Sequence, residues 1–297
     1  MDKKLIDAML LRGFSKKTQK CYIAAVKDLA AYYHRSPDHL TEEQIQAYFL
    51  YLVKERHLSG SSCIVMRSAI RFFYINVLSW EEVSLQTIEV PKRAQRIPEL
   101  LSREDVRRLL HACRNHKHRT LLSTVYGCGL RVSEAVNLEL KHIDSERHII
   151  RLEQAKGAKA GFCSCKTCIH HIPVDNRQVL LTETLLSMLR RYWRAHKPTT
   201  WLFFGNDKDN SLTISSVQKI YEAAKHRAKI DKVGGIHALR HAYATHQLEA
   251  GMPVHQLQRL LGHNDIHTTM RYVHWLPHLQ ADVRGADLLK GLEVDDE

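Results

Sequence analysis

The chain has 297 residues, and 44% of them are hydrophobic, a proportion typical of a globular protein with one large core or two smaller ones. Lys and Arg outnumber Asp and Glu by 44 to 32, which gives a formal net charge of +12, and neither end carries a long basic tail. A basic surface spread over a folded chain indicates a polyanionic partner.

The seven cysteines and the N-terminal residues indicate a reducing compartment. The cysteines are an odd number and fit reduced thiols better than a disulfide framework. No stretch approaches the roughly 18 apolar residues of a membrane span, and the start MDKKLIDAMLLRGF is too polar for a secretory signal. We therefore expect a cytoplasmic protein without a membrane segment. The cysteines are Cys21, Cys63, Cys113, Cys128, Cys163, Cys165 and Cys168.

Residues 1–86 are expected to form a helical domain. Thr41 and Gln44 form a capping box, followed by apolar residues at helical spacing over 45–53. A helix before it starts at Ser15, and a shorter one is expected over 5–11. Another helix follows the serines of LSGSSCIVMRSAIRFFYINVL, with its apolar positions at Val65, Ile70, Phe73 and Ile75.

Residues 87–101 are predicted to be a linker, because two prolines and a basic cluster interrupt the helical pattern there. A new helix begins at Ser102, with two acidic residues in its first turn. RHIIRLEQ, HHIPVD and WLFF at 201–204 are expected to be short strands, and the later segments are helical. The predicted fold is mainly α, with a small antiparallel β-element in a second domain over 102–297.

The segment HALRHAYATH, residues 237–246, raises the question of whether a cation or an anion binds there. His237 and His241 have the spacing of a zinc-binding pair on a helix, but the residues between them include Arg240 and no carboxylate. His237 and Arg240 lie on one helical face, after two glycines that allow close approach of the backbone. This pattern favours a phosphate site over a metal site. The alternative is a solvated helix face.

Three further features of the sequence suit a phosphate site. In GCGLRVSEA, residues 127–135, Arg131 precedes a helix and can add a guanidinium to that helix's N–H donors. A dinucleotide fingerprint is disfavoured there, because Val132 occupies the place of the third glycine. LLGH ends in His263, and Tyr272 follows nine residues later.

These motifs, in this order, resemble the tyrosine recombinase, or phage integrase, family. The matching residues are GLRVSE (129–134), HALRHAYATH (237–246), LLGH (260–263) and Tyr272. Together with an N-terminal domain that looks like the family's SAM-like core-binding domain, the resemblance covers most of the chain. The nearest likeness is to Xer-like, transposon and integron recombinases.

The resemblance implies a set of roles for these residues. Arg131 and Arg240 hold the scissile phosphate, and His263 donates a further hydrogen bond. His237 donates another bond or accepts the proton of the nucleophile. Tyr272 attacks to form a 3′-phosphotyrosyl link, and a hairpin lysine protonates the departing 5′-oxygen. Lys156 is favoured for that role because it ends the predicted strand.

Three other residues have alternative roles. Tyr243 and Tyr221 compete as nucleophiles, but Tyr243 lies in an apolar helical pattern and is expected in the core. Glu134 follows Arg131 by about one turn and either orients that guanidinium or is an exposed helix acid.

The sequence departs from the family pattern after Lys159, where AGFCSCKTCIHH is inserted. The donors of this insertion are Cys163, Cys165, Cys168, His170 and His171, and they could form a tetrahedral zinc site. The alternative is a thiol-containing loop over the DNA minor groove. The insertion also leaves Lys159 open as the general acid.

The expected function is site-specific DNA recombination for integration, excision or transposition. The resemblance implies double-stranded DNA as the partner and a homotetramer on two sites, without a metal, another cofactor, ATP or a small-molecule substrate. The tail after Pro277 is expected to dock on a neighbouring subunit or on its own domain. The alternatives are a type IB topoisomerase-like activity and a non-catalytic DNA-binding protein.

Overall fold

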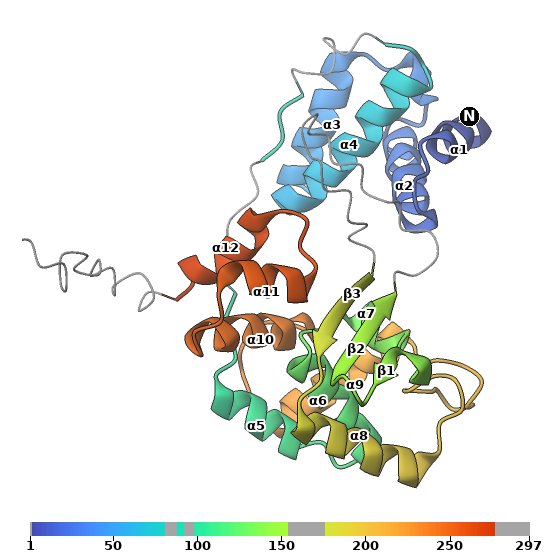
Figure 1. Ribbon diagram of the computed structural model, residues 1–297. Helices are drawn as coiled ribbons and strands as arrows, with labels where there is room; N and C mark the ends of the chain where they lie inside the picture. Colours follow the sequence, from blue (N-terminus) through green and yellow to red (C-terminus); the bar gives the residue numbers. More distant parts are fainter. Residues whose placement is uncertain (1, 81–87, 92–97, 154–175, 277–297) are drawn as a thin grey trace, which may run out of the picture. The chain divides into compact units, whose positions relative to one another are not determined.

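The structure is a computed structural model that describes residues 2–80, 88–91, 98–153 and 176–276. These residues divide into two compact units (Figure 1). We call them the N-terminal unit, with described residues up to 91, and the C-terminal unit, from 98 onward. Lys156, Lys159, the proposed zinc ligands and the tail after Pro277 lie outside the described residues.

The described part of the N-terminal unit is helical, as predicted. Three of its four described α-helices begin after a Ser or Thr side chain that accepts a hydrogen bond from a backbone N–H of the first turn. Thr41 and Gln44 make the predicted capping box, with the Gln44 side-chain oxygen Oε1 accepting from the Thr41 N–H at 2.9 Å. The helices are α1 (Asp2–Leu11), α2 (Lys16–Tyr33), α3 (Glu42–Lys54) and α4 (Gly60–Asn76), with a 3₁₀ turn η1 at Pro37–His39.

The core of the N-terminal unit is formed by the apolar faces of these helices. Leu29, Phe49 and Phe73 are fully or almost fully buried. Val65, which was expected on the apolar stripe of α4, is 45% exposed. It lies two residues after the buried Cys63, which places it about 200° away around the helix. The prediction for Val65 was therefore wrong.

The C-terminal unit contains most of the helices in the described chain. Eight of the 13 residues of its helix α10 are buried. The helices are α5 (Arg103–His111), α6 (His116–Gly127), α7 (Val132–Val136), α8 (Glu183–His196), α9 (Ile214–Arg227), α10 (His237–Glu249), α11 (Val254–Leu261) and α12 (Ile266–His274), with a 3₁₀ turn η3 at Leu140–His142.

A three-stranded antiparallel sheet completes the described C-terminal unit. Its order is β1 (Ile143–Asp144), β2 (Ile149–Glu153) and β3 (Asn176–Leu180), with Ile150 opposite Val179. The prediction of β2 is confirmed, whereas the expected strand HHIPVD lies outside the described residues.

The expected strand WLFF is not formed. Trp201 bridges Glu139, and Phe204 bridges Ser211, each as an isolated pair. Because the two partners belong to different segments, no ladder extends along the run.

Two hydrophobic clusters hold the C-terminal unit together. The larger one contains side chains from each of the helices α5 through α10 and from strands β2 and β3. The smaller one contains side chains of α10, α11 and α12 around Tyr243, Leu257 and Tyr272. Within the described residues, no helix is both long enough and apolar enough to cross a membrane. The mainly α fold with a small antiparallel sheet matches the prediction.

Candidate active site

Glu134 holds two arginines at the start of α7. Arg131, the N-cap residue of α7, donates from its backbone N–H to Glu134 Oε2 at 2.7 Å and from Nη1 to Oε1 at 2.9 Å. Arg177 of β3 donates to both carboxylate oxygens, each at 2.7 Å. Burial alone would raise the pKa of Glu134, but Arg177 and Arg131 outweigh it and lower that pKa. The ionised carboxylate therefore orients Arg131, whose side chain remains 41% exposed.

Arg240 is almost completely buried in α10, with 1% of its surface exposed. Its Nη1 donates to the Gly129 carbonyl at 2.6 Å, and its Nη2 donates to the Leu261 carbonyl at 2.5 Å. Burial, together with the nearby Arg131 and other cations, lowers the pKa of Arg240 to about 9. The guanidinium remains charged at neutral pH, and its position is fixed by backbone oxygens.

The C-terminal turn of α11 contacts both motif arginines. Gly262, the C-cap residue, has φ +62°, which glycine adopts without steric cost. Its carbonyl accepts from Arg131 Nη2 at 3.1 Å, while the preceding carbonyl, of Leu261, accepts from Arg240. Two consecutive carbonyls therefore hold Arg131 and Arg240.

His263 lies directly after this turn and connects Arg240 to α12. Its Nε2 is 3.2 Å from Arg240 Nη2, and its Nδ1 is 2.9 Å from Thr269 Oγ1. Because a guanidinium can only donate, Nε2 is assigned as the acceptor, and Nδ1 carries the proton and donates to Thr269. Burial and the charges of Arg240 and Arg131 lower the pKa of His263 to about 4. The imidazole is therefore neutral in this arrangement.

Tyr272 of α12 is buried, with 3% of its surface exposed. Its hydroxyl is 3.1 Å from His241 Nδ1. Its ring lies nearly parallel to that of His263, at a centroid distance of 6.2 Å, and Trp275 packs edge-on against it. Burial raises the pKa of Tyr272, although Arg240 and Arg131 oppose this effect. The phenol is therefore protonated in this arrangement.

His237 and His241 lie on one side of α10, with ring centroids 4.7 Å apart. His237 keeps contact with solvent, yet partial desolvation of its ring and the charges of Arg240 and Arg131 lower its pKa. Deeper burial, with His237 and Arg240 nearby, lowers the pKa of His241 to about 4. Both rings are therefore neutral at physiological pH.

Metal ligands do not gather around this pair. Within the part of the chain that the structure describes, no three His, Cys, Asp or Glu side chains are placed to hold a metal ion. The inserted cysteines and histidines that could bind zinc lie outside that part.

The motif residues predicted from the sequence come together at one place. Arg131, Arg240, His263 and Tyr272 are connected through the contacts above, and His237 joins them through the ring of His241. Tyr243 is buried in the core, as expected, and the other competing tyrosine, Tyr221, is buried as well. Of the two alternatives for Glu134, the structure has the contact with the Arg131 guanidinium, and the carboxylate is not exposed.

Sequence reasoning missed two residues of the site. Arg177 lies 43 residues after its partner Glu134, and no local pattern connects the two. His241 was considered only as half of a metal pair, although its position next to Arg240 was a usable signal.

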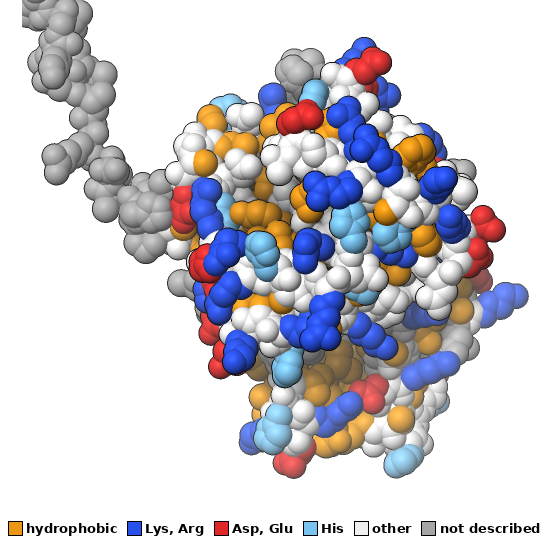
Figure 2. Space-filling model, turned by 90° about the horizontal axis from the view of Figure 1, so that it is seen from below, with side chains coloured by type: hydrophobic (Ala, Val, Ile, Leu, Met, Phe, Trp, Pro, Cys, Tyr) orange, Lys and Arg blue, Asp and Glu red, His pale blue; other side chains and the backbone are white. Residues whose placement is uncertain are grey.

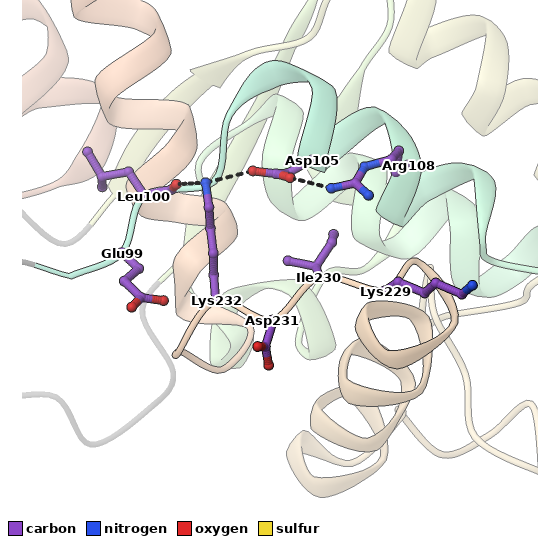
Figure 3. A pocket seen from close by; sticks show the side chains of 8 residues that line it. All are labelled: Glu99, Leu100, Asp105, Arg108, Lys229, Ile230, Asp231 and Lys232. Atoms are coloured by element: carbon purple, nitrogen blue, oxygen red, sulfur yellow. Dashed lines mark hydrogen bonds and ion pairs between the residues drawn. The ribbon is translucent and has the colours of Figure 1, made fainter.

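A separate pocket of about 530 Å³ is lined by both acidic and basic side chains (Figure 3). Lys232 Nζ donates to the Leu100 carbonyl at 2.6 Å and to Asp105 Oδ2 at 2.7 Å, and Arg108 pairs with Asp105 (Figure 3). None of the motif residues lines this pocket. We therefore place the candidate site at the arginines and histidines described above. The contact between Lys232 and Asp105 holds the loop before α10 against α5.

Basic side chains are widespread on one face of the molecule. Seen from below, Lys and Arg side chains outnumber Asp and Glu on the face that includes α5 and α8 (Figure 2). This distribution agrees with the formal charge of +12 and with a polyanionic partner.

Comparison with known proteins gives matches over both units. The profile of the Phage integrase family matches residues 99–278, and that of the Phage integrase, N-terminal SAM-like domain matches residues 2–82. A Sinorhizobium fredii protein named "Putative integrase/recombinase y4qK" is 36% identical, over 91% of this chain and 82% of that protein. A Saccharolobus solfataricus protein named "Tyrosine recombinase XerA" is 28% identical, over 91% of this chain and 86% of that one.

A solved structure has the same fold. It is the Tn1549 transposon integrase in complex with transposon right end DNA, which superposes with a TM-score of 0.70 at 18% identity, over 91% of this chain and 93% of that chain.

Proposed function

Because the chain belongs to the phage integrase family, we propose that it is a tyrosine-type site-specific recombinase that cuts and rejoins DNA through Tyr272. The observation that carries the proposal is the convergence of Tyr272, two arginines and His263 on the C-terminal turn of α11. A phosphodiester needs fixed cations for its developing negative charge and a nucleophile nearby, and this cluster supplies both.

Arg131 and Arg240 neutralise the two non-bridging oxygens of the scissile phosphate. Arg131 presents a partly exposed guanidinium, while Arg240 contributes a buried charge that two backbone carbonyls hold in place. In this structure, His263 accepts a bond from Arg240. To donate to a phosphate oxygen from Nε2, it must take up a proton or change tautomer. His237, at the solvent-facing start of α10, donates to the phosphate or accepts the nucleophile's proton.

In the cleavage step, the Tyr272 oxygen forms a bond to phosphorus as the bond between phosphorus and the 5′-oxygen breaks. The phenol loses its proton, and the departing oxygen gains one from Lys156, or alternatively from Lys159. The product is a 3′-phosphotyrosyl ester and a free 5′-hydroxyl. Because one ester replaces another, the reverse attack rejoins the strand without ATP. The positive charge in this step comes from Arg131 and Arg240, so the proposal requires no metal.

Residues 1–86 supply the core-binding domain and residues 102–297 the catalytic domain in this proposal. The partner is double-stranded DNA, in keeping with the DNA complex of the similar Tn1549 transposon integrase. In this proposal, four copies act on two sites. Integration, excision and transposition all use this same strand exchange.

A nicked suicide substrate tests the proposal. DNA carrying a candidate site from beside the gene is incubated with the full-length protein, without ATP and with a chelator. Denaturing gel electrophoresis then detects covalent protein–DNA complex. We expect a band with the wild type and none with Tyr272→Phe.

Tyr243→Phe is the matched control, because it removes a hydroxyl from a buried core tyrosine of the same unit. It should retain the band. Loss of the band in Tyr243→Phe, or its persistence in Tyr272→Phe, would contradict the assignment of the nucleophile.

A further inference from the structure

The hydroxyl of Tyr272 is not available to a phosphate in this structure. Tyr272 is 3% exposed, and a phosphate bound at the exposed side of Arg131 must approach from solvent. Attack requires the reacting atoms to come within about 3–3.5 Å of each other. The phenol must therefore leave its buried position before cleavage.

The described contacts that hold this position come from two histidines. Of the nine residues of α12, only Thr269 and Tyr272 are buried. Thr269 bonds to His263, and Tyr272 bonds to His241. Helix α12 is therefore attached to the rest of the site by two polar contacts, besides the apolar packing of its last residues.

His241 is well suited to hold the phenol. Its ring is mostly enclosed and neutral, because burial lowers its pKa to about 4. A neutral imidazole whose proton is on Nε2 presents Nδ1 as an acceptor for the Tyr272 hydroxyl. Trp275 packs edge-on against both rings, at centroid distances of 5.6 Å from His241 and 5.2 Å from Tyr272.

We propose that His241 is a positioning residue that holds Tyr272 in a retracted, non-attacking position until DNA is bound. The inference rests on the proposed function, because it assigns the resting state of the same nucleophile. Removing the acceptor leaves a buried hydroxyl without a partner, which favours the exposed position of the phenol.

Two substitutions of His241 separate the hydrogen bond from the rest of the side chain. His241→Leu removes the acceptor but keeps an apolar group of moderate size. His241→Asn places an amide oxygen near the position of Nδ1, so it can still accept the bond. The rate of covalent complex formation on saturating suicide substrate should rise about fivefold or more in His241→Leu and stay near the wild-type rate in His241→Asn.

A second measurement reports on Tyr272 without requiring cleavage. The full-length protein without DNA is treated with tetranitromethane, which nitrates accessible phenols, and peptide mass spectrometry gives the extent of modification at Tyr272. We expect low nitration in the wild type and in His241→Asn, and higher nitration in His241→Leu. Tyr221, buried in α9, serves as the internal reference.

The outcomes distinguish this inference from the proposed function. Equal nitration of Tyr272 in all three proteins overturns the positioning role, whether or not cleavage is observed. Slower cleavage in His241→Leu, recovered at higher pH, also overturns it, because it would make His241 a proton acceptor in the reaction. Higher nitration in His241→Leu, without any covalent complex in the wild type, supports the positioning role and contradicts the proposed cleavage.

Discussion

Glu134 is a single carboxylate on which three arginines of the site depend. Arg177 occupies both of its oxygens, Arg131 shares them, and Arg240 lies 3.9 Å from Oε2. Its side chain is only 17% exposed, so water cannot replace these contacts effectively. Without this anion, three positive charges would remain close together in a poorly solvated region.

Glu134→Gln should therefore destabilise the C-terminal unit strongly. Breaking a buried ion pair by removing one partner costs about 3–5 kcal/mol. Chemical denaturation followed by circular dichroism measures this change. Glu104→Gln is the control, because Glu104 forms a salt bridge with Arg107 on the exposed surface and its loss should have little effect. Equal effects of the two substitutions would show that Glu134 does not organise the arginines.

The buried histidines predict a dependence of stability on pH. His241 and His263 have their pKa values lowered from 6.5 to about 4. Between these values the unfolded chain binds protons that the folded chain does not, so the stability due to neutral burial is complete above about pH 6.5 and is lost as pH falls toward 4. The free energy of unfolding should fall over this interval.

His241→Asn removes one of the two titrations and keeps the hydrogen bond to Tyr272. Urea unfolding at several pH values should show a smaller decrease between pH 6.5 and 4 in this variant than in the wild type. An identical pH dependence in both proteins would mean that His241 is not buried in its neutral form.

At the scale of single elements, Gly262 determines how α11 meets the site. Its φ is +62°, and a Cβ there would lie 2.8 Å from Arg177 Nη1 and 2.9 Å from Arg177 Cδ. Gly262→Ala would add backbone strain and would also push Arg177 away from Glu134. Gly251, with φ +87° and open space around it, offers the backbone strain alone.

We expect Gly262→Ala to destabilise the protein by about 1–3 kcal/mol more than Gly251→Ala does. Thermal unfolding of the two variants measures the difference. Equal destabilisation would mean that Arg177 moves aside without a loss of stability. Its pairing with Glu134 would then not be rigid.

Local signals in the sequence predicted the helices well. The capping box at Thr41 and the acidic first turn after Ser102 lie next to the apolar patterns that they start, so a few consecutive residues define each helix. Long-range pairing left no such signal. WLFF has the composition of a strand, but its bridging partners lie in separate segments, which composition does not reveal.

In the candidate site, too, the sequence predicted what lies within short motifs and did not predict long-range contacts. Arg131, Arg240, His263 and Tyr272 were predicted because each lies in a short motif. The chain of contacts from Arg177 through Glu134 to Arg131 depends on strand pairing and on the turn after α11, so it became visible only in three dimensions.

For the whole molecule, the charge of +12 predicts binding that depends strongly on salt. Each phosphate that a cation neutralises contributes about −0.9 to the slope of log affinity against log salt concentration. Fluorescence anisotropy with a labelled duplex should show that log affinity falls by several units for each unit of log salt concentration. Arg131→Ala should make the slope shallower by about one unit. A salt-independent affinity would contradict a phosphate-directed interface.

The C-terminal turn of α11 couples the positions of Arg131 and Arg240, because its carbonyls accept hydrogen bonds from both. Leu261 and Gly262 are adjacent in the chain, so a phosphate that draws Arg131 away from one carbonyl loosens the peptide unit that restrains Arg240. The second guanidinium is then easier to recruit than the first. We therefore expect capture of the phosphate to be cooperative, with few molecules in which only one arginine is engaged.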